Sequence, residues 1–105
     1  MDEVEKPAEF PGGNDAWVNF LKKNLKVPGQ LEENTSKTVE AGFYVTQDGR
    51  IENIEIMKSG GKEYDKEVLR VLSLMPRWKP RQKGRLLVGV NVKQPITFKN
   101  EGIEL

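Results

Sequence analysis

Ionisable side chains are abundant in this chain, but few of them are spaced for catalysis. The 105 residues include no cysteine and no histidine, which removes thiol nucleophiles, disulfides and the commonest metal ligands. Four carboxylates could in principle pair as acid and base: Glu52, Glu55, Asp65 and Glu67. No nucleophile or further base accompanies them, so exposed strand and helix charges explain them better. We therefore expect no enzyme, no cofactor and no metal site.

A basic stretch around one aromatic residue is the next candidate. Five cations surround Trp78, namely Arg77, Lys79, Arg81, Lys83 and Arg85. Such a pattern could bind nucleic acid or an anionic wall polymer. The net charge is only +1 and the rest of the chain supplies no matching basic surface, so we interpret the stretch as a solvated loop. No nucleic-acid partner is expected.

Four residues with special local chemistry are interpreted as structural. Asp48-Gly49 is a hairpin-turn signal, and no second acidic residue lies at the spacing of a cation-binding loop. Trp78 lies between prolines, the second of which is Pro80, and it could contact a partner. A loop aromatic that folds back onto the core is the preferred interpretation, with Trp78 at least half buried. Gly12-Gly13 lacks the further glycine and lysine of a phosphate-binding loop.

The most informative binding feature is a strand of alternating polarity over residues 85–99. Its even positions from Leu86 to Phe98 are apolar except Gln94, which predicts one buried and one solvated face. Pro95 cannot donate a ladder hydrogen bond, which favours an edge position. An open edge can accept a peptide as an added strand, although it can also be a merely protected edge. If the strand is regular, its odd positions direct their backbone outward, and the predicted partner-binding residues are Leu87, Gly89, Asn91, Lys93 and Pro95.

The other elements follow from hydrophobic spacing. Trp17, Leu21 and Leu25 predict a helix capped by Asn14 or Asp15 and ended by Pro28, with one short helical turn over residues 30–34. Residues 39–45 and 51–58 predict a hairpin in which Ala41 faces Ile56 and Phe43 faces Ile54. Spacing from Tyr64 to Met75 predicts a second helix that ends at Pro76, before a loop over residues 77–84.

This order predicts an α+β domain, a two-layer sandwich. The sheet is a three-stranded antiparallel or mixed sheet of order 2-1-3, with two helices on one face. Residues 14–99 form the expected domain, which suits a chain of this length. Residues 1–13 are expected to be a mobile N-terminal tail or linker, and residues 100–105 a C-terminal tail. No apolar run approaches a membrane span and no signal peptide is recognisable.

Five segments in the same order resemble the C-terminal domain of TonB, as found in energy transducers of the Bacteroidetes type. They cover the chain from Pro7 to Phe98 almost completely: Pro7–Gly13 (P-E-F-P-G-G), Lys23–Pro28 (K-N-L-x-Y-P), Gln47–Ile51 (D-G-x-V), Asp65–Pro80 (D-K-E-A-x-R-V…M-P-x-W-x-P) and Gln94–Phe98 (x-P-I-T-F). Val27 replaces the usual tyrosine of the second motif. Residues 29–37 also depart from the family's usual sequence.

The resemblance implies a periplasmic, non-enzymatic domain of an inner-membrane-anchored protein. Such a domain binds the TonB box peptide of an outer-membrane transporter by strand addition and transmits force from a proton-driven motor complex. The motor proteins would be reached through an upstream segment, so we expect this chain to be a fragment. Val27, Pro28, Arg77 and Lys79 are expected as secondary contacts. The alternative is a regulatory or structural homodimer that pairs or swaps the same edge.

Overall fold

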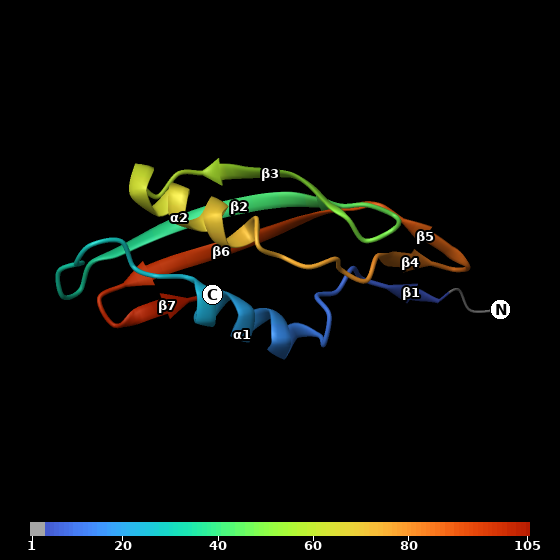
Figure 1. Cartoon of the computed structure of the whole chain (residues 1–105), viewed down its shortest axis with the longest axis horizontal. Coiled ribbons are helices and arrows are strands. Elements are labelled where there is room, and N and C mark those ends of the chain that lie inside the picture. The colour runs from blue at the N-terminus through green and yellow to red at the C-terminus, as the bar shows by residue number, and fades with distance from the viewer. Residues whose placement is uncertain (1–3) are drawn as a thin grey trace.

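The computed structural model describes residues 4–105 and contains two helices and seven strands (Figure 1). In chain order the elements are β1 (Glu5–Lys6), α1 (Asn14–Asn24), β2 (Ser36–Val45), β3 (Ile51–Lys58), α2 (Lys62–Leu72), β4 (Arg81–Lys83), β5 (Leu86–Val88), β6 (Val90–Lys99) and β7 (Gly102–Glu104). They form a four-stranded sheet of order β3-β2-β6-β7 and a three-stranded sheet of order β1-β4-β5.

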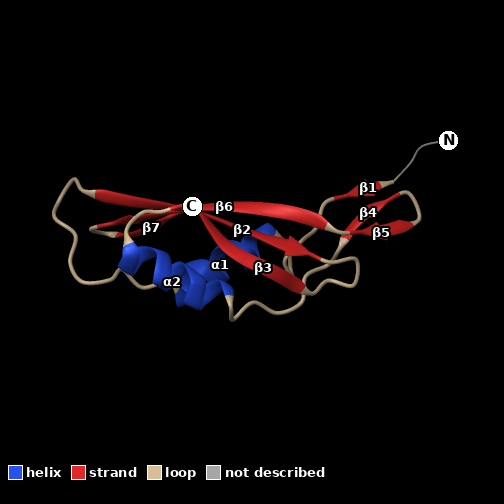
Figure 2. Cartoon of the chain, turned by 90° about the horizontal axis from the view of Figure 1, so that it is seen from above, coloured by secondary structure: helices blue, strands red, loops and turns tan. Residues whose placement is uncertain are grey.

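The larger sheet confirms the predicted α+β fold. Its first three strands have the predicted 2-1-3 order, and all neighbouring strands are antiparallel. Figure 2 shows both helices on the same side of β2 and β6. The strand β7 extends the expected three-stranded sheet, because residues 100–101 form a tight turn that returns the chain along β6.

The core lies between this sheet and the helices. Alternate residues of β2 are fully buried, as the period of two requires. The buried apolar side chains are Phe10, Trp17, Leu21, Leu25, Leu31, Val39, Ala41, Phe43, Val45, Val68, Val71, Leu72, Trp78, Ile96 and Phe98. Five aromatic rings pack together at one end of this core, with centroids 5.0–6.2 Å apart: Phe10, Trp17, Phe20, Phe43 and Trp78.

The start and end of α1 differ from the prediction. Gly13 is the N-cap residue and no side chain caps the helix, so neither Asn14 nor Asp15 has the expected role. The Phe10 carbonyl accepts a hydrogen bond from the Gly13 N–H at 2.8 Å, across a turn with proline second and glycine third. Gly12 has φ of 93°, which this turn requires. The helix ends at Asn24, before the predicted limit at Pro28.

The helix α2 begins as predicted but ends early. Glu63 and Asp65 lie in its first turn, where negative charge is favourable. The Asp65 carboxylate also accepts a hydrogen bond from the Gly60 N–H at 2.9 Å. Ser73 is the C-cap residue, so Met75 lies beyond the helix and Pro76 does not end it.

The β2–β3 hairpin has a longer loop than Asp48-Gly49 alone. Val45 pairs with Ile51, and the Thr46 N–H donates to the Arg50 carbonyl at 2.9 Å. Gly49, with φ of 84°, follows a tight turn in the manner of a three-residue hairpin loop with a bulge. The predicted Ala41–Ile56 pair is confirmed, but an irregularity between Gly42 and Tyr44 removes the predicted Phe43–Ile54 pair.

The segment before β2 contains no helical turn, contrary to the prediction for residues 30–34. The Thr35 N–H donates to the Glu32 carbonyl at 3.0 Å, which closes a single β-turn. Asn34 occupies a positive φ of 65° in this turn, a conformation that asparagine tolerates better than most residues. Buried Leu31 fixes the segment to the core.

The smaller sheet explains three further differences. The predicted loop over residues 77–84 contains β4, and the predicted strand over residues 85–99 divides at Gly89 into β5 and β6. The N-terminal segment was expected to be a mobile tail, but β1 pairs with β4 and Glu9 forms a bridge with Lys79. Residues 1–3 of that segment lie outside the described residues. A separate difference concerns the larger sheet, since the expected C-terminal tail contains β7.

Candidate functional site

The candidate site is the outer edge of β6. On its inner edge β6 pairs with β2 along ten consecutive positions, from Ser36–Lys99 to Val45–Val90. On its outer edge it pairs with β7 only at residues 97–99. Figure 1 shows β7 beside one end of the β5–β6 run and β4 and β1 beside the other, all on the same side. The outer edge is therefore bounded at both ends, and residues 89–96 lie between these limits.

The N-terminal segment borders one end of this edge. A pocket there is lined by residues 5–8, Arg81 and residues 90–92. Arg81 is held in place by an ion pair with Glu5, whose Nη2–Oε1 distance is 3.4 Å. An incoming strand at residues 90–92 would therefore meet both backbone and side chains from the segment that was expected to be a tail.

Side chains of β6 alternate as the sequence predicts. Ile96 and Phe98 are fully buried, whereas Asn91, Lys93 and Pro95 are exposed. Gln94 is the one polar residue at an even position, and its Oε1 accepts a hydrogen bond from Trp17 Nε1 at 2.7 Å. This hydrogen bond joins α1 to β6 next to the open edge.

A close contact at Gly89 separates β5 from β6. A Cβ atom at this position would lie 1.8 Å from the Tyr44 hydroxyl oxygen, so only glycine fits without movement of the ring. Tyr44 belongs to β2, where it pairs with Asn91. The glycine that divides the predicted strand is thus required by its packing against Tyr44.

The structure divides the five predicted partner-binding residues between three places. Asn91, Lys93 and Pro95 lie in β6 along the open edge, and Gly89 lies at its limit. Leu87 lies in β5 and pairs with Gln82 of β4. Three of the five residues therefore form one continuous run along the edge.

The four predicted secondary contacts do not form one surface in the described residues. Val27 packs partly against the core, and Pro28 lines a shallow pocket with side chains of α2. Arg77 donates to the Asp48 carbonyl at 3.3 Å, and Lys79 lies 3.8 Å from the Glu9 carboxylate. These contacts are to different parts of the fold.

The residues interpreted as structural meet one another. The Trp78 N–H donates to the Gly49 carbonyl at 2.9 Å, so the segment after α2 is bonded to the β2–β3 turn. Trp78 is 7% exposed, which confirms its predicted burial. A hydrogen bond from the Thr46 hydroxyl, with a smaller contribution from Arg50, lowers the pKa of Asp48. Pro80 is partly buried beside Leu87.

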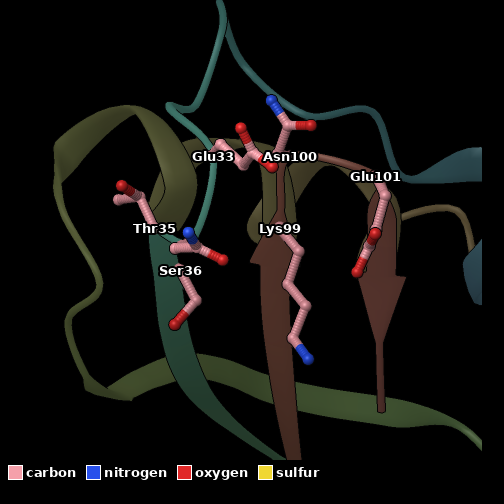
Figure 3. A pocket seen from close by; sticks show the side chains of 7 residues that line it. Glu33, Thr35, Ser36, Lys99, Asn100 and Glu101 are labelled. Carbon is pink, nitrogen blue, oxygen red and sulfur yellow. The ribbon is translucent and has the colours of Figure 1, made fainter.

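A polar pocket at the other end of the sheet offers no catalytic set. Figure 3 shows its side chains, which come from the segment before β2, the start of β2 and the β6–β7 turn. Lys99 forms an ion pair with Glu104, which raises the pKa of Lys99. Asn100 donates to the Leu31 carbonyl at 2.6 Å. These interactions join the turn to neighbouring backbone and leave no activated nucleophile.

The carboxylates considered for acid–base chemistry have structural partners or face solvent. Glu52 and Glu55 are exposed on β3. Glu67 accepts hydrogen bonds from Arg70 and from the Lys26 N–H at 2.8 Å, and these bonds lower its pKa. Within residues 4–105 no three His, Cys, Asp or Glu residues gather as metal ligands.

Three residues that support β6 through the aromatic cluster around Trp17 were not identified from the sequence. Phe10 and Phe20 complete the aromatic cluster, and Gln94 bonds to Trp17. The signal for Gln94 was its polarity at an otherwise apolar position. Phe20 lies beside the predicted helical stripe, and Phe10 precedes the helix, so neither fits a simple period.

Comparison with protein families gives one match. The family described as the Gram-negative bacterial TonB protein C-terminal matches residues 31–100, which include β2 to β6. No match was found among curated proteins. Among the described residues no helix is long and apolar enough to cross a membrane. The matched family is a periplasmic, transport-associated and non-enzymatic one. Since this match covers two thirds of the sequence and includes the candidate edge, the chain belongs to the TonB C-terminal family.

Proposed function

We propose that this domain captures the TonB box of an outer-membrane transporter as an added strand on β6. The observation that carries this proposal is the outer edge at residues 89–96, between β7 and the β4–β1 end, which pairs with no strand among residues 4–105. Backbone groups of an open edge supply affinity for an extended peptide, while neighbouring pockets can select its side chains. A peptide here would extend the four-stranded sheet without moving a helix.

Backbone parity supports the assignment of the outward-facing groups. In an antiparallel pair each residue directs its N–H and C=O to one side, and successive residues alternate. Pro95 lies opposite Glu40 and has no N–H to donate. Proline is best tolerated where the missing N–H would face away from β2. Asn91 and Lys93 lie four and two residues before Pro95, so their backbone groups face the same outward side. The same parity includes Lys99, which pairs with Gly102 of β7 on the outer edge.

The long β2–β6 ladder supports a role in transmitting force. A peptide pulled along β6 would load the ten β2–β6 pairs in parallel rather than open them one at a time. The load would pass into the helical layer through buried Ile96 and Phe98 and through the Trp17–Gln94 hydrogen bond. In this proposal the domain acts in the periplasm and receives its force from a proton-driven inner-membrane complex through an upstream segment.

A second copy of the chain is the alternative occupant of the edge. The same unpaired backbone could pair with its counterpart in a homodimer. Lys93 is exposed near the middle of the edge, so antiparallel self-pairing would bring two like charges close together. This repulsion favours the peptide.

The test is titration of the full chain with synthetic TonB-box peptides from transporters of the same genome. We expect dissociation constants on the order of micromolar, as for a small transient interface. Asn91→Pro should weaken binding at least tenfold while the protein stays folded, whereas the exposed control Asn19→Ala on α1 should bind normally. Equal binding by wild type and Asn91→Pro would reject this edge. A concentration-dependent dimer without peptide binding would favour the alternative.

A further inference from the structure

The β4–β5 hairpin forms an apolar tip at one end of the molecule, away from the helices (Figures 1 and 2). Leu86 is 68% exposed, Leu87 is 52% exposed and Val4 is 49% exposed. The Gly84 N–H donates to the Val4 carbonyl, and Gln82 Nε2 donates to the Gly84 carbonyl at 2.9 Å. The tip is therefore an ordered structure that holds three large apolar side chains in solvent.

Both faces of the hairpin carry one of the leucines. Lys83 pairs with Leu86 and Gln82 pairs with Leu87, and paired residues share a face of the ribbon. Because successive side chains alternate, Leu86 and Leu87 point to opposite faces. A rigid partner lying on one face could cover only one leucine. A soft apolar medium entered by the tip would cover both.

The charges around the tip indicate what kind of apolar medium fits. Lys83 and Arg85 are exposed, and within residues 4–105 no ion pair engages either side chain. The nearby acid Glu5 is neutralised by Arg81. Cations beside exposed leucines are the pattern of segments that enter the surface of an anionic bilayer. Two basic tips would repel each other, which argues against a second copy of this chain.

We propose that the β4–β5 tip is a contact site for an anionic lipid bilayer, into which Leu86 and Leu87 insert while Lys83 and Arg85 bind lipid headgroups. This contact is separate from the β6 edge, since β5 uses its own exposed side chains and β6 its backbone. Binding at the tip therefore does not require the peptide.

The experiment is cosedimentation of the full chain with vesicles of two compositions, equal parts phosphatidylglycerol and phosphatidylcholine, or phosphatidylcholine alone. The full chain includes Asp2 and Glu3 before Val4, so any repulsion from these carboxylates is part of the result. We expect sedimentation with the anionic vesicles and little with the neutral ones. The double variant Leu86→Ser, Leu87→Ser should lower the partition coefficient about tenfold or more, since two exposed leucines lose their burial in lipid.

Two matched controls separate the contribution of the exposed leucines from that of the cations. Leu74→Ser removes a leucine that is 53% exposed elsewhere on the surface and should leave sedimentation unchanged. Lys83→Gln with Arg85→Gln should reduce binding, whereas Lys58→Gln with Lys66→Gln should not. Melting curves verify that each variant is folded.

Three results would overturn the proposal. The first is wild-type protein that stays in solution with both vesicles. The second is binding that is lost in the charge variant but kept in the leucine variant, which would indicate a polyanion site. The third is a leucine-dependent dimer, detected by sedimentation velocity, without binding to vesicles.

Discussion

Trp78 and Gly49 are joined through their backbones, although 28 residues separate them in the sequence. The Trp78 N–H donates to the Gly49 carbonyl at 2.9 Å, and a Cβ atom on Gly49 would lie 2.1 Å from the Trp78 carbonyl oxygen. The β2–β3 turn and the segment after α2 are thereby packed without space for a side chain. Two motifs that carried the family resemblance are thus parts of one contact.

This contact predicts a strong effect of a single methyl group. Gly49→Ala should lower the free energy of unfolding by about 2–4 kcal/mol, because it combines a positive φ with a backbone clash. Gly29→Ala is the matched control, since Gly29 also has a positive φ but nothing lies within 4 Å of its added Cβ. Its cost should be about 1 kcal/mol. Chemical denaturation measures both, and equal costs would refute the clash.

Trp78 should be replaceable by another aromatic residue but not by alanine. Trp78→Ala should cost about 3–5 kcal/mol of unfolding free energy, as for a buried aromatic side chain. Trp78→Phe should cost only about 1–2 kcal/mol, because the buried indole Nε1 has no hydrogen-bond partner in residues 4–105. A melting temperature that does not change in Trp78→Ala would show that this ring does not stabilise the core.

Hydrophobic periodicity was sufficient to predict the 2-1-3 sheet, both helices and the buried face of β2. It could not identify the smaller sheet, because β1 and β4 contain only two or three polar residues each, and the apolar residues of β5 continue the alternating pattern of β6. The position of Gly89 was visible as a weak point in the strand. Its consequence depended on Tyr44, which is distant in sequence and packs over the glycine.

The N-terminal segment should contribute to stability through Phe10. This ring is 8% exposed and lies 5.9 Å from the Trp78 ring, centroid to centroid. Phe10→Ala should therefore cost about 3–5 kcal/mol of unfolding free energy. Removal of residues 1–9 should cost more than about 0.5 kcal/mol, the scale of an ordinary surface change. A truncated protein as stable as the full chain would show that β1 and the Glu9–Lys79 bridge add nothing.

Glu67 lies at the contact between α2 and the end of α1, and it should make the stability of the protein depend on pH. It accepts hydrogen bonds from Arg70 and from the Lys26 N–H, and Arg70 donates to the Asn24 carbonyl at the end of α1. Glu67→Gln should cost about 1 kcal/mol near neutral pH, because the charged acceptor is lost.

The sign of this pH dependence follows from the lowered pKa of Glu67 in the folded protein. A carboxylate with a depressed folded pKa stabilises the protein above its ordinary value of 4.5 and loses that contribution as the pH falls through the folded pKa. The difference between wild type and Glu67→Gln should therefore shrink on acidification. A difference that is constant from neutral to acidic pH would contradict this role.

Part of the candidate edge was predictable because Pro95 and the alternation of residues 90–99 are local signals. The limits of the edge were not, since they depend on strands that pair from distant segments. Leu87 illustrates this limit of the prediction. It is one of the odd-numbered positions predicted to face outward, yet it pairs with Gln82 of β4. Asn91 and Lys93 have the same parity and lie between β4 and β7.

Amide hydrogen exchange along β6, followed residue by residue with and without a TonB-box peptide, tests the central claim most directly. In the free monomer we expect the Asn91 and Lys93 amides to exchange rapidly and the Val92 amide slowly, because only Val92 donates to β2. Peptide binding should slow exchange at Asn91 and Lys93 and leave Val92 unchanged. Protection of Asn91 equal to that of Val92 in the free monomer, or bound peptide with no added protection at Asn91 and Lys93, would contradict strand addition at this edge.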